Sequence, residues 1–397
     1  MKNNIHALIK AHATALLDKV IAYRETMHQH PELSFQEHHT MAFVAQQLTK
    51  LGIEHKTGVA ETGVVALIKN SNHTINQACI ALRSELDALP ILEQTGLPFA
   101  SQNEGVMHAC GHDVHSAILL GVAEILHGLR DELNSPIKLI FQPGEEKNPG
   151  GASLMMKAGV LENPPVKEMI ALHVFPEMEV GKIGFREGLY MASCDEIYLT
   201  IHGKGGHGAM PHQTIDPIMI GAQLLTGLQQ IVSRKCDPKI PTVLSFGHFE
   251  AIGATNIIPE TAVLKGTFRT MNEAWRAEAH ELISSFVEKT CDQFGATASL
   301  TIDKGYPYLE NDPIVTRSMK QAAVDFFGAE KVEDMPIRLT SEDFSFYAQE
   351  IPVCFFRLGV RNEAKGITFG VHHPKFDSDN QALLVGMQAM CLAAFRQ

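Results

Sequence analysis

The sequence predicts an α/β protein in which a helix-covered, mainly parallel sheet is interrupted by an inserted α+β domain. Three observations carry this prediction. Short apolar runs alternate with helical patterns along the first part of the chain, which is typical of parallel sheets covered by helices. The middle of the chain follows a different order, and the last part returns to the first pattern. A chain of 397 residues has room for roughly two to three domains.

The first part of the chain supplies helices and strands in alternation. Apolar residues at helical spacing predict a helix over 5–29, and a second helix over 39–51 ends at Gly52. Four apolar, β-rich runs bounded by turn residues predict strands at 63–69, 78–83, 136–141 and 168–174. A helix over about 113–131 separates the second of these strands from the third.

The middle of the chain predicts the order β-α-β-β-α-β, which is the split motif of ferredoxin-like domains. Its elements fall at 195–203, 214–234, 241–250, 260–270, 273–293 and 297–304. We therefore expect an inserted domain over 188–304, while 1–187 and 305–397 form the other domain. A strand at 352–358 and a final helix at 378–395 complete that other domain.

Charge and composition exclude several classes of partner. The chain has 33 basic and 45 acidic residues, a net charge of −12, and no cluster of Lys or Arg relieves it. Nucleic acid and anionic membranes are therefore not expected partners, and the apolar runs are too short to span a bilayer. The start MKNNIHALIKAHATALLDKV lacks the apolar core of a signal peptide, and the seven cysteines form no CxxC pair. These features predict a cytoplasmic protein with reduced thiols.

The sequence has 20 histidines, and several of them cluster with acidic residues and one cysteine. Such clusters are typical of metal-binding sites. The segment MHACGHDVH places Cys110, His112 and His115 within six residues at the start of a helix. Thiolate and imidazole are good ligands for zinc-like ions. In extended backbone, Cys110 and His112 would point the same way and reach one ion. A buried free cysteine beside a helix N-cap is the alternative.

Other segments offer carboxylates and imidazoles in the same setting. Glu145 and Glu146 follow an apolar strand and a Pro-Gly turn. Adjacent extended residues point to opposite sides, so one is expected to bind metal and the other to hold a water as general base. His173 ends an apolar strand, Asp87 follows one, and His372 lies in a turn before the last helix. The alternatives are solvated surface acids for the two glutamates and a structural histidine at position 173. Asp87 could be a turn residue, and His372 a capping or surface residue.

Taken together, these candidates predict a catalytic metal site. Asp87, the two glutamates and His173 all lie at the carboxyl ends of predicted strands, the edge where open parallel sheets bind ligands. The combined donors exceed the four ligands of a closed structural zinc site and suit two ions that share a water. The run 203–208 matches GxGxxG but lacks the rest of a dinucleotide fold, and the sequence has neither GxSxG nor a P-loop. Cys110 as a nucleophile stays open.

These motifs, in this order, resemble the aminoacylase and hippurate hydrolase branch of the dimetal amidohydrolases and carboxypeptidases, which includes plant auxin-conjugate hydrolases. The matching segments cover nearly the whole chain: HQHPELSFQE at 28–37, LRSELDALPI, MHACGHDVH, FQPGEE, ALHV, GKGGHGAMPH, TNIIPE, GTFR, TSEDFSFY and HHPKFD. The chain departs from many relatives at Ser84 and Glu85, where they have Ala and Asp, but it keeps Asp87.

The resemblance implies a role for each matching position. The implied metal ligands are Cys110, His112, Glu146, His173 and His372. His372 is preferred to His373 because the family pattern places its ligand two residues before the proline. Glu145 is implied as the general base, which takes a proton from water and passes it to the leaving amine. Asp87 corresponds to an acid that orients a metal-binding histidine.

The resemblance also implies roles within the inserted domain. His207 is expected to steady the oxyanion, and in relatives with a dimerising lid it reaches the site of the partner subunit. Asn256 and Arg269 are expected to grip the substrate carboxylate, a task that suits the planar fork of arginine. Lid structure is the alternative for all three residues.

The implied function is hydrolysis of the amide bond of N-acyl amino acids, with acetyl, benzoyl or similar acyl groups, to a carboxylate and a free amino acid. Two divalent ions per subunit are expected, zinc or manganese first and nickel or cobalt next, in a homodimer or dimer-based oligomer formed through the lid. A dipeptidase or carboxypeptidase with the same dimetal site is the main alternative. A non-catalytic metal-binding protein and a thiol hydrolase that uses Cys110 are the others.

Overall fold

The computed structural model describes residues 2–74 and 77–396. The chain divides into two compact units. The first comprises the residues up to Gly188, Glu310–Pro336 and those from Asp343 onward, and the second comprises Leu189–Leu309 and Ile337–Glu342. The second unit therefore also takes in 305–309 and 337–342, which the sequence assigns to the other domain.

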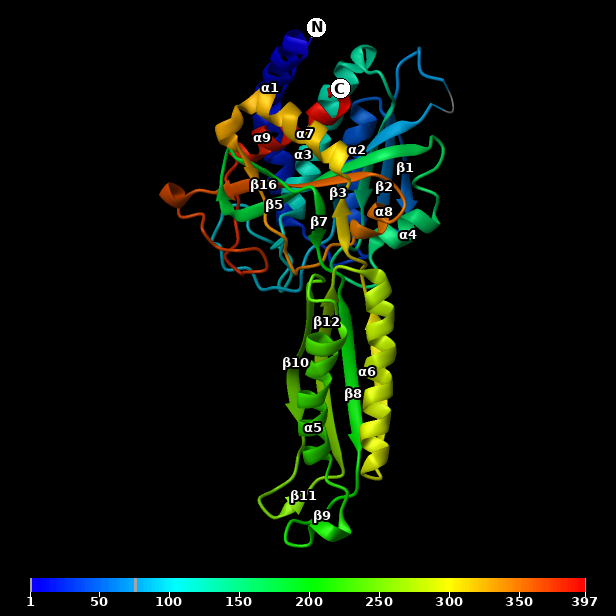
Figure 1. Ribbon diagram of the computed structural model, residues 1–397. Coiled ribbons are helices and arrows are strands. Elements are labelled where there is room, and N and C mark those ends of the chain that lie inside the picture. Colours follow the sequence, from blue (N-terminus) through cyan, green and yellow to red (C-terminus); the bar gives the residue numbers. More distant parts are fainter. Residues whose placement is uncertain (1, 75–76, 397) are drawn as a thin grey trace. The chain divides into compact units, whose positions relative to one another are not determined.

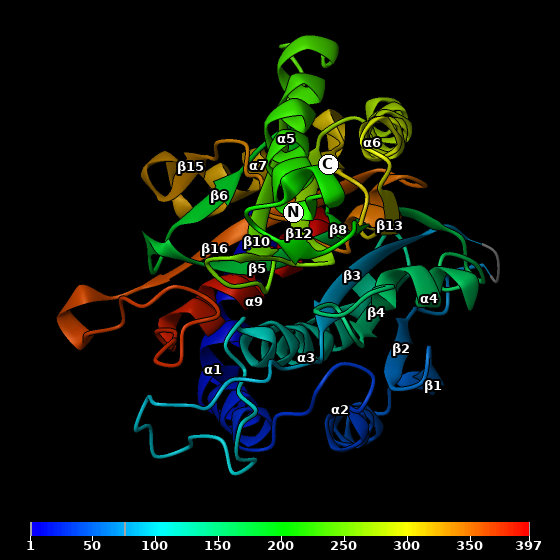
Figure 2. The same ribbon diagram turned by 90° about the horizontal axis from the view of Figure 1, so that it is seen from below.

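The first unit is built on an eight-stranded sheet with the order β1-β2-β4-β3-β5-β16-β6-β15 (Figure 1). The strands are β1 (Glu54–Val59), β2 (Gly63–Ile68), β3 (Cys79–Glu85), β4 (Ile137–Gln142), β5 (Val166–Glu179), β6 (Ile183–Phe185), β15 (Val332–Asp334) and β16 (Val353–Arg361). Parallel pairing joins β4 to β3, β3 to β5, β5 to β16 and β6 to β15. The short turn between β1 and β2 forces an antiparallel hairpin, and β2 also pairs antiparallel with β4. The sheet is therefore mixed, with parallel strands at its centre (Figure 2).

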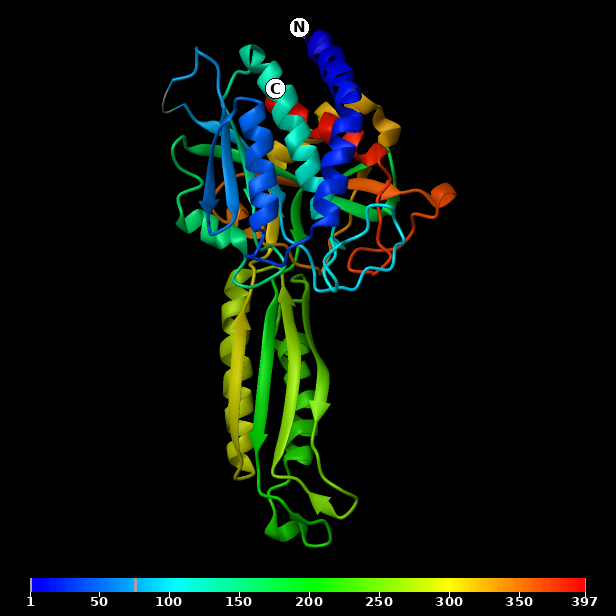
Figure 3. The ribbon, with the colours of Figure 1, turned by 180° about the vertical axis from the view of Figure 1, so that it is seen from behind.

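Helices cover this sheet. They are α1 (Lys2–Gln29), α2 (His38–Lys50), α3 (His112–Gly128), α4 (Gly151–Lys157), α7 (Pro313–Phe327), α8 (Ser345–Ala348) and α9 (Gln381–Phe395). Helices α1, α2 and α3 lie on one face of the sheet (Figure 3). Helix α3 is apolar and buried around almost its whole circumference, as expected of a helix packed between others, and it contacts α1 and α9. The apolar core of the unit therefore surrounds the helix whose first turn carries His112.

The second unit contains β8 (Asp195–His202), α5 (Pro217–Gln230), β10 (Thr242–Glu250), β12 (Thr261–Thr270), α6 (Glu273–Gln293) and β13 (Thr297–Lys304). Its four strands pair antiparallel in the order β10-β12-β8-β13. The sequence predicts the same succession of elements. Asp216 and Asn272 cap the two helices with side-chain oxygens, as residues before helices commonly do.

Short strands complete the fold. The pair β9 (Gly206–His207) and β11 (Ile257–Ile258) lies in the second unit, and β7 (Gly188–Met191) and β14 (Leu309–Asn311) lie where the chain passes from one unit to the other. A π-helical turn over Ile231–Lys235 extends α5. Among the described residues, every helix falls short of the length and apolarity that crossing a membrane requires.

Candidate metal centre

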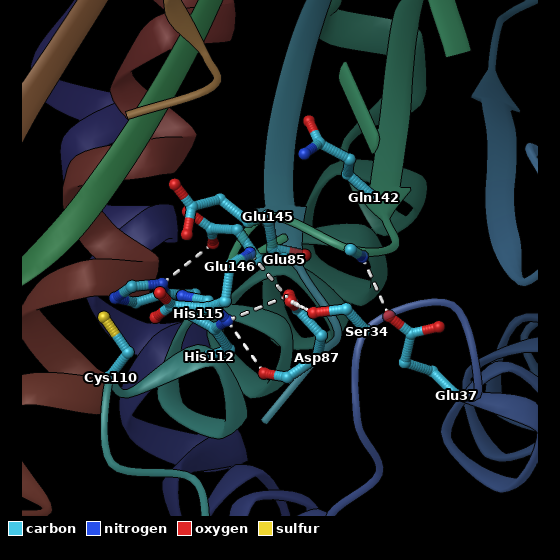
Figure 4. A network of polar contacts seen from close by, with 12 residues as sticks. Ser34, Glu37, Glu85, Asp87, Cys110, His112, His115, Gln142, Glu145 and Glu146 are labelled. Carbon is cyan, nitrogen blue, oxygen red and sulfur yellow. Dashed lines mark hydrogen bonds and ion pairs between the residues drawn. The ribbon is translucent and has the colours of Figure 1, made fainter. Parts of the chain in front are cut away.

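The carboxyl ends of the central strands bring the predicted side chains of the first unit to one edge. Glu85 ends β3 beside Gln142, which ends β4. His173 lies within the longer strand β5, two residues beyond the level of Arg83 in the neighbouring strand. Because parallel strands end at the same edge, the residues that follow β3 and β4 meet there (Figure 4).

Two overlapping groups of donor atoms form at this edge. One ligand atom each of Cys110, His112 and His173 lies within 4.8 Å of the others, and the same holds for Cys110, Glu146 and His372. Cys110 belongs to both groups. The structure therefore brings together all five predicted ligands, in two sets that share one sulfur. Sulfur, imidazole and carboxylate donors suit zinc and related divalent ions.

Unpaired buried atoms indicate that these donors fit a cation. Nε2 of His112 and Oε1 of Glu146 are buried without a hydrogen-bond partner among the described residues. Buried polar atoms normally have such a partner, so two that converge on one place need an explanation. Oε1 of Glu146 also lies 3.2 Å from Nε2 of His372, a distance that suits two ligands of one ion.

His112 contacts Asp87, the residue to which the resemblance assigns the orientation of a metal-binding histidine. Nδ1 of His112 donates to the backbone oxygen of Asp87 at 2.8 Å and lies 3.2 Å from its Oδ1. Oδ2 of Asp87 accepts the hydroxyl of Ser34 at 2.7 Å and the backbone N–H of Glu146 at 2.9 Å. The proton on Nδ1 leaves Nε2 of His112 free for a metal ion.

His173 is oriented by the backbone. Its Nδ1 donates to the carbonyl of Val174 at 2.8 Å, and its Nε2 lies 3.4 Å from the sulfur of Cys110. The backbone bond fixes which nitrogen carries the proton, so Nε2 faces the sulfur as a lone-pair donor.

The electrostatics of the edge favour a bound cation. Burial lowers the pKa of His112, but the bond to Asp87 and the nearby carboxylates outweigh it and raise that pKa to about 10. Burial, with the charges of Glu146 and Glu145, raises the pKa of the Cys110 thiol well above its usual value. Such surroundings disfavour a free thiolate. The same carboxylates would stabilise a divalent ion.

One expectation about the backbone and one about side-chain direction are wrong, although Cys110 and His112 converge as expected. The backbone between Cys110 and His112 is not extended, because Gly111 adopts a left-handed conformation (φ +83°) and turns the chain into α3. A Cβ at Gly111 would lie 2.6 Å from Cγ2 of Val174, so only glycine fits. Glu145 and Glu146 do not point to opposite sides either. They lie in a turn, and both reach within 4.8 Å of a ring nitrogen of His112.

Sequence reasoning missed a buried charged network behind the site. Glu85 accepts from Nδ1 of His115 at 2.8 Å and pairs with Arg83, whose guanidinium also donates to Asp343 at 2.7 Å. Asp343 accepts both 2.8 Å bonds from the amide of Gln142. Charged residues inside a buried strand such as β3 are the signal that could have found this network, since unpaired charges are rarely buried.

The predicted residues of the second unit fall into two places. His207 lies on β9 opposite Ile257 of β11, and the N–H of Gly208 donates to the carbonyl of Asn256 at 2.8 Å. His207 and Asn256 are therefore neighbours, and both are exposed.

Arg269 lies in the four-stranded sheet, whereas β9 and β11 form a separate two-stranded sheet. It is the penultimate residue of β12 and donates to Oγ of Ser341 at 3.2 Å. Strand β12 spans ten residues, about 30 Å at the usual rise per residue. Asn256 precedes the start of this strand and Arg269 lies one residue before its end, so one copy of the second unit does not bring the two side chains to the same carboxylate.

Donor atoms converging at the carboxyl edge of an α/β sheet, with a further buried carboxylate beside them, define a metal-dependent hydrolase. The chain belongs to Peptidase family M20/M25/M40, whose model matches residues 81–396. The resemblance inferred from the motifs is thereby confirmed.

Named relatives and a solved structure support this assignment. The chain is 44% identical over 299 residues to an N-acyl-L-amino acid amidohydrolase of Geobacillus stearothermophilus, covering 74% of this chain and 79% of that protein. It is 38% identical to thermostable carboxypeptidase 1 of Saccharolobus solfataricus, covering 96% and 95%. The crystal structure of the Bacillus subtilis YXEP protein, described as a dinuclear metal-binding peptidase of the M20 family, matches with a TM-score of 0.81 at 34% identity, covering 96% and 98%. These matches establish the mixed α/β fold.

Proposed function

We propose that this chain hydrolyses the amide bond of N-acyl amino acids, releasing a carboxylate and a free amino acid. The observation that carries the proposal is the place of Glu145, one of whose carboxylate oxygens lies within 4.8 Å of ligand atoms of His112 and Glu146. A carboxylate beside a metal site, and not needed as a ligand, is what a general base requires. The relative named an N-acyl-L-amino acid amidohydrolase supports the substrate class.

The donor sets would hold two divalent ions, with zinc or manganese as the first candidates and nickel or cobalt as the next. The ligands would be Cys110, His112, Glu146, His173 and His372. When bound, such ions polarise a carbonyl group and make a water molecule more acidic. Asp87 would hold His112 in the tautomer that leaves Nε2 free to bind.

Glu145 would move the proton of the reaction. Its carboxylate is buried, with 7% of the residue exposed, and Oε1 lies 3.4 Å from the backbone N–H of Asp343. Glu145 would take a proton from the attacking water and deliver it to the nitrogen of the leaving amino acid. This transfer breaks the amide without a covalent intermediate on the protein.

The second unit would act as a lid that also joins two subunits. His207 would stabilise the oxyanion, and Asn256 and Arg269 would hold the substrate carboxylate. Because Asn256 precedes β12 and Arg269 lies near its far end, a carboxylate held by both would lie between two copies of the chain. This separation supports a homodimer in which one subunit supplies His207 and Asn256 to the site of its partner.

A carboxypeptidase acting through the same site is the second candidate. The match to thermostable carboxypeptidase 1 over nearly the whole chain favours it. Both substrate classes carry a carboxylate next to the scissile amide, and they differ in the acyl group. Dipeptides therefore belong in any test of the proposal.

The test measures amine release from N-acetyl, N-benzoyl and indole-acetyl amino acids and from dipeptides. Chelator-treated protein is assayed with and without added Zn²⁺ or Mn²⁺. We expect metal-dependent release from at least one N-acyl amino acid. Release only from dipeptides would replace the proposal with the carboxypeptidase, and absence of release from every substrate with either metal would overturn both.

A further inference from the structure

The segment 34–37 contacts the turn that carries Glu145 and Glu146. It lies between α1 and α2, within the motif HQHPELSFQE, and none of the roles proposed above involves it. Ser34, Phe35 and Glu37 each reach toward the turn, either directly or through Asp87. Figure 4 shows Ser34 and Glu37 beside it.

Glu37 holds the backbone of the turn. Its side chain is completely buried, and Oε1 accepts the N–H of Gly144 at 2.8 Å. Oε2 accepts the hydroxyl of Thr62. A buried carboxylate is costly unless both oxygens are hydrogen-bonded, so this arrangement ties Glu37 firmly to the residue that precedes Glu145.

Phe35 and Gly144 fit against each other closely. Gly144 has φ +56°, and a Cβ there would lie 2.4 Å from Cε1 and Cζ of the Phe35 ring. Phe35 itself has φ +66°, a conformation that is uncommon for a bulky residue and costs on the order of 1 kcal/mol. Such a cost persists only where the surroundings impose it. The Phe35 ring therefore occupies the space that a side chain at position 144 would need.

Ser34 reaches the other side of the turn through Asp87. Its hydroxyl donates to Oδ2 of Asp87, and the same oxygen accepts the N–H of Glu146. The amides of Gly144 and Glu146, on either side of Glu145, are thus both held by buried carboxylates.

We propose that segment 34–37 positions the two adjacent glutamates, with Glu37 as a positioning residue that acts through the backbone of Gly144. The proposal rests on the function proposed above for Glu145 and Glu146. Glu37 itself is buried away from solvent and would touch neither substrate nor metal ion. Its removal should let the turn move, so that Glu145 misses the attacking water and Glu146 binds its ion less well.

The experiment compares Glu37→Ala with Glu37→Gln in the full-length protein. We measure kcat and KM on the best substrate of the panel, Zn²⁺ affinity by competition with a chelator, and the unfolding midpoint. Glu37→Ala should lower kcat and Zn²⁺ affinity, each by about 10- to 100-fold, the usual effect of losing a group that orients a ligand. KM should stay nearly unchanged. Glu37→Gln can still accept from Gly144 and donate to Thr62, so it should recover most of both losses.

Glu32 offers a matched control from the same stretch. Its carboxylate accepts the backbone N–H groups of His39 and Thr40 at 3.0 and 2.9 Å, at the start of α2. Glu32→Ala therefore removes hydrogen bonds of the same kind without touching the turn. It should lower the unfolding midpoint and leave kcat and Zn²⁺ affinity unchanged. An equal loss of kcat in Glu32→Ala and Glu37→Ala would show a general effect on stability and overturn the proposal.

Two further outcomes are decisive. Folded Glu37→Ala with wild-type kcat and Zn²⁺ affinity would overturn the proposal. If Glu37→Ala does not fold, Ser34→Ala decides, because it removes a single hydrogen bond to Asp87. A lower kcat would then support the proposal and an unchanged kcat would overturn it.

The Zn²⁺ measurement separates this proposal from the function on which it rests, because it needs no turnover. If the wild-type protein binds Zn²⁺ but cleaves no amide, the proposed function fails. Weaker binding by Glu37→Ala than by Glu37→Gln would still support the positioning role. Equal binding by both variants would overturn that role.

Discussion

The buried carboxylate of Glu85 accepts a hydrogen bond from Nδ1 of His115 at 2.8 Å. Nε2 of the same ring accepts the backbone N–H of Val174 at 2.9 Å, and the carbonyl of Val174 accepts from Nδ1 of His173. Glu85 on β3 is therefore linked to the proposed ligand His173 on β5 through an imidazole that is not itself one of the proposed ligands.

Replacing His115 by Ala should weaken Zn²⁺ binding by about 10- to 100-fold, because the backbone that orients His173 loses its support. His115→Gln should restore most of the affinity, since an amide can donate to Glu85 and accept from Val174. Chelator competition on metal-free protein measures both variants. Equal Zn²⁺ affinity in His115→Ala and the wild type would contradict the link.

The roles of Glu145 and Glu146 should be distinguishable in a pair of matched variants. Glu145→Gln should lower kcat by about 10²- to 10⁴-fold and keep the bound metal, because it removes the proton acceptor but no proposed ligand. Glu146→Gln should instead weaken metal binding. Metal analysis after gel filtration, together with initial rates, distinguishes the two effects. Wild-type turnover by Glu145→Gln would rule out the proposed mechanism.

Cys110→Ala should weaken the binding of both ions, since its sulfur belongs to both donor groups. His372→Ala removes a member of one group only and should leave one ion bound more tightly than the other. Zn²⁺ titrations followed by calorimetry report the number and affinity of the sites. Two sites of unchanged affinity in Cys110→Ala would mean that the sulfur is no ligand.

Subunits carrying different lesions should complement each other. Glu145→Ala and His207→Ala should each be nearly inactive as homodimers, the second because removing an oxyanion donor costs about 10²- to 10³-fold. A hybrid dimer would contain one site with both residues intact, so it should recover about half of the wild-type activity. The hybrid can be purified with two different tags. An inactive hybrid would show that His207 serves its own subunit.

Asp195 should make the second unit sensitive to acid. Burial raises the pKa of Asp195, but hydrogen bonds from His280 and Arg276 outweigh it and hold that pKa below its usual value. A carboxylate whose pKa is lower in the folded state stabilises the fold above its unfolded pKa of about 4, and this stabilisation is lost as pH falls through the folded value.

Asp195→Asn should therefore lower the free energy of unfolding of the second unit by about 3 kcal/mol at pH 7. The difference from the wild type should shrink as the pH falls from about 5 to 2. The single tryptophan, Trp275, is buried in this unit, so its fluorescence in urea reports the transition. The exposed Asp292 provides a control, because Asp292→Asn should change little at any pH. A pH-independent difference for Asp195→Asn would contradict the assignment of the charge.

Much of the fold was predictable from local pattern. Helix α6 begins and ends where the sequence predicts because Asn272 caps it and its apolar face is regular. Strands such as β4 are buried on both faces and read as continuous apolar runs. Strand β1 escaped prediction because it is an edge strand of mostly exposed, polar residues.

The site was predictable where residue type carries the chemistry. Cys110 and His173 are recognisable as donors wherever the chain places them. The direction of Glu145 and Glu146 was not, because it depends on a turn in the backbone. The contact of Glu37 with Gly144 joins residues 107 apart in sequence through a backbone N–H, which no side-chain pattern records.

The length of β12 has a kinetic consequence. If Asn256 of one chain and Arg269 of another must bind the same substrate carboxylate, an isolated chain is inactive even when it folds and binds metal. Specific activity would then rise with protein concentration and level off once nearly every chain is part of a dimer. Dilution alone would switch the enzyme off, with no inhibitor and no loss of structure, and the midpoint of that loss would report the dissociation constant of the pair.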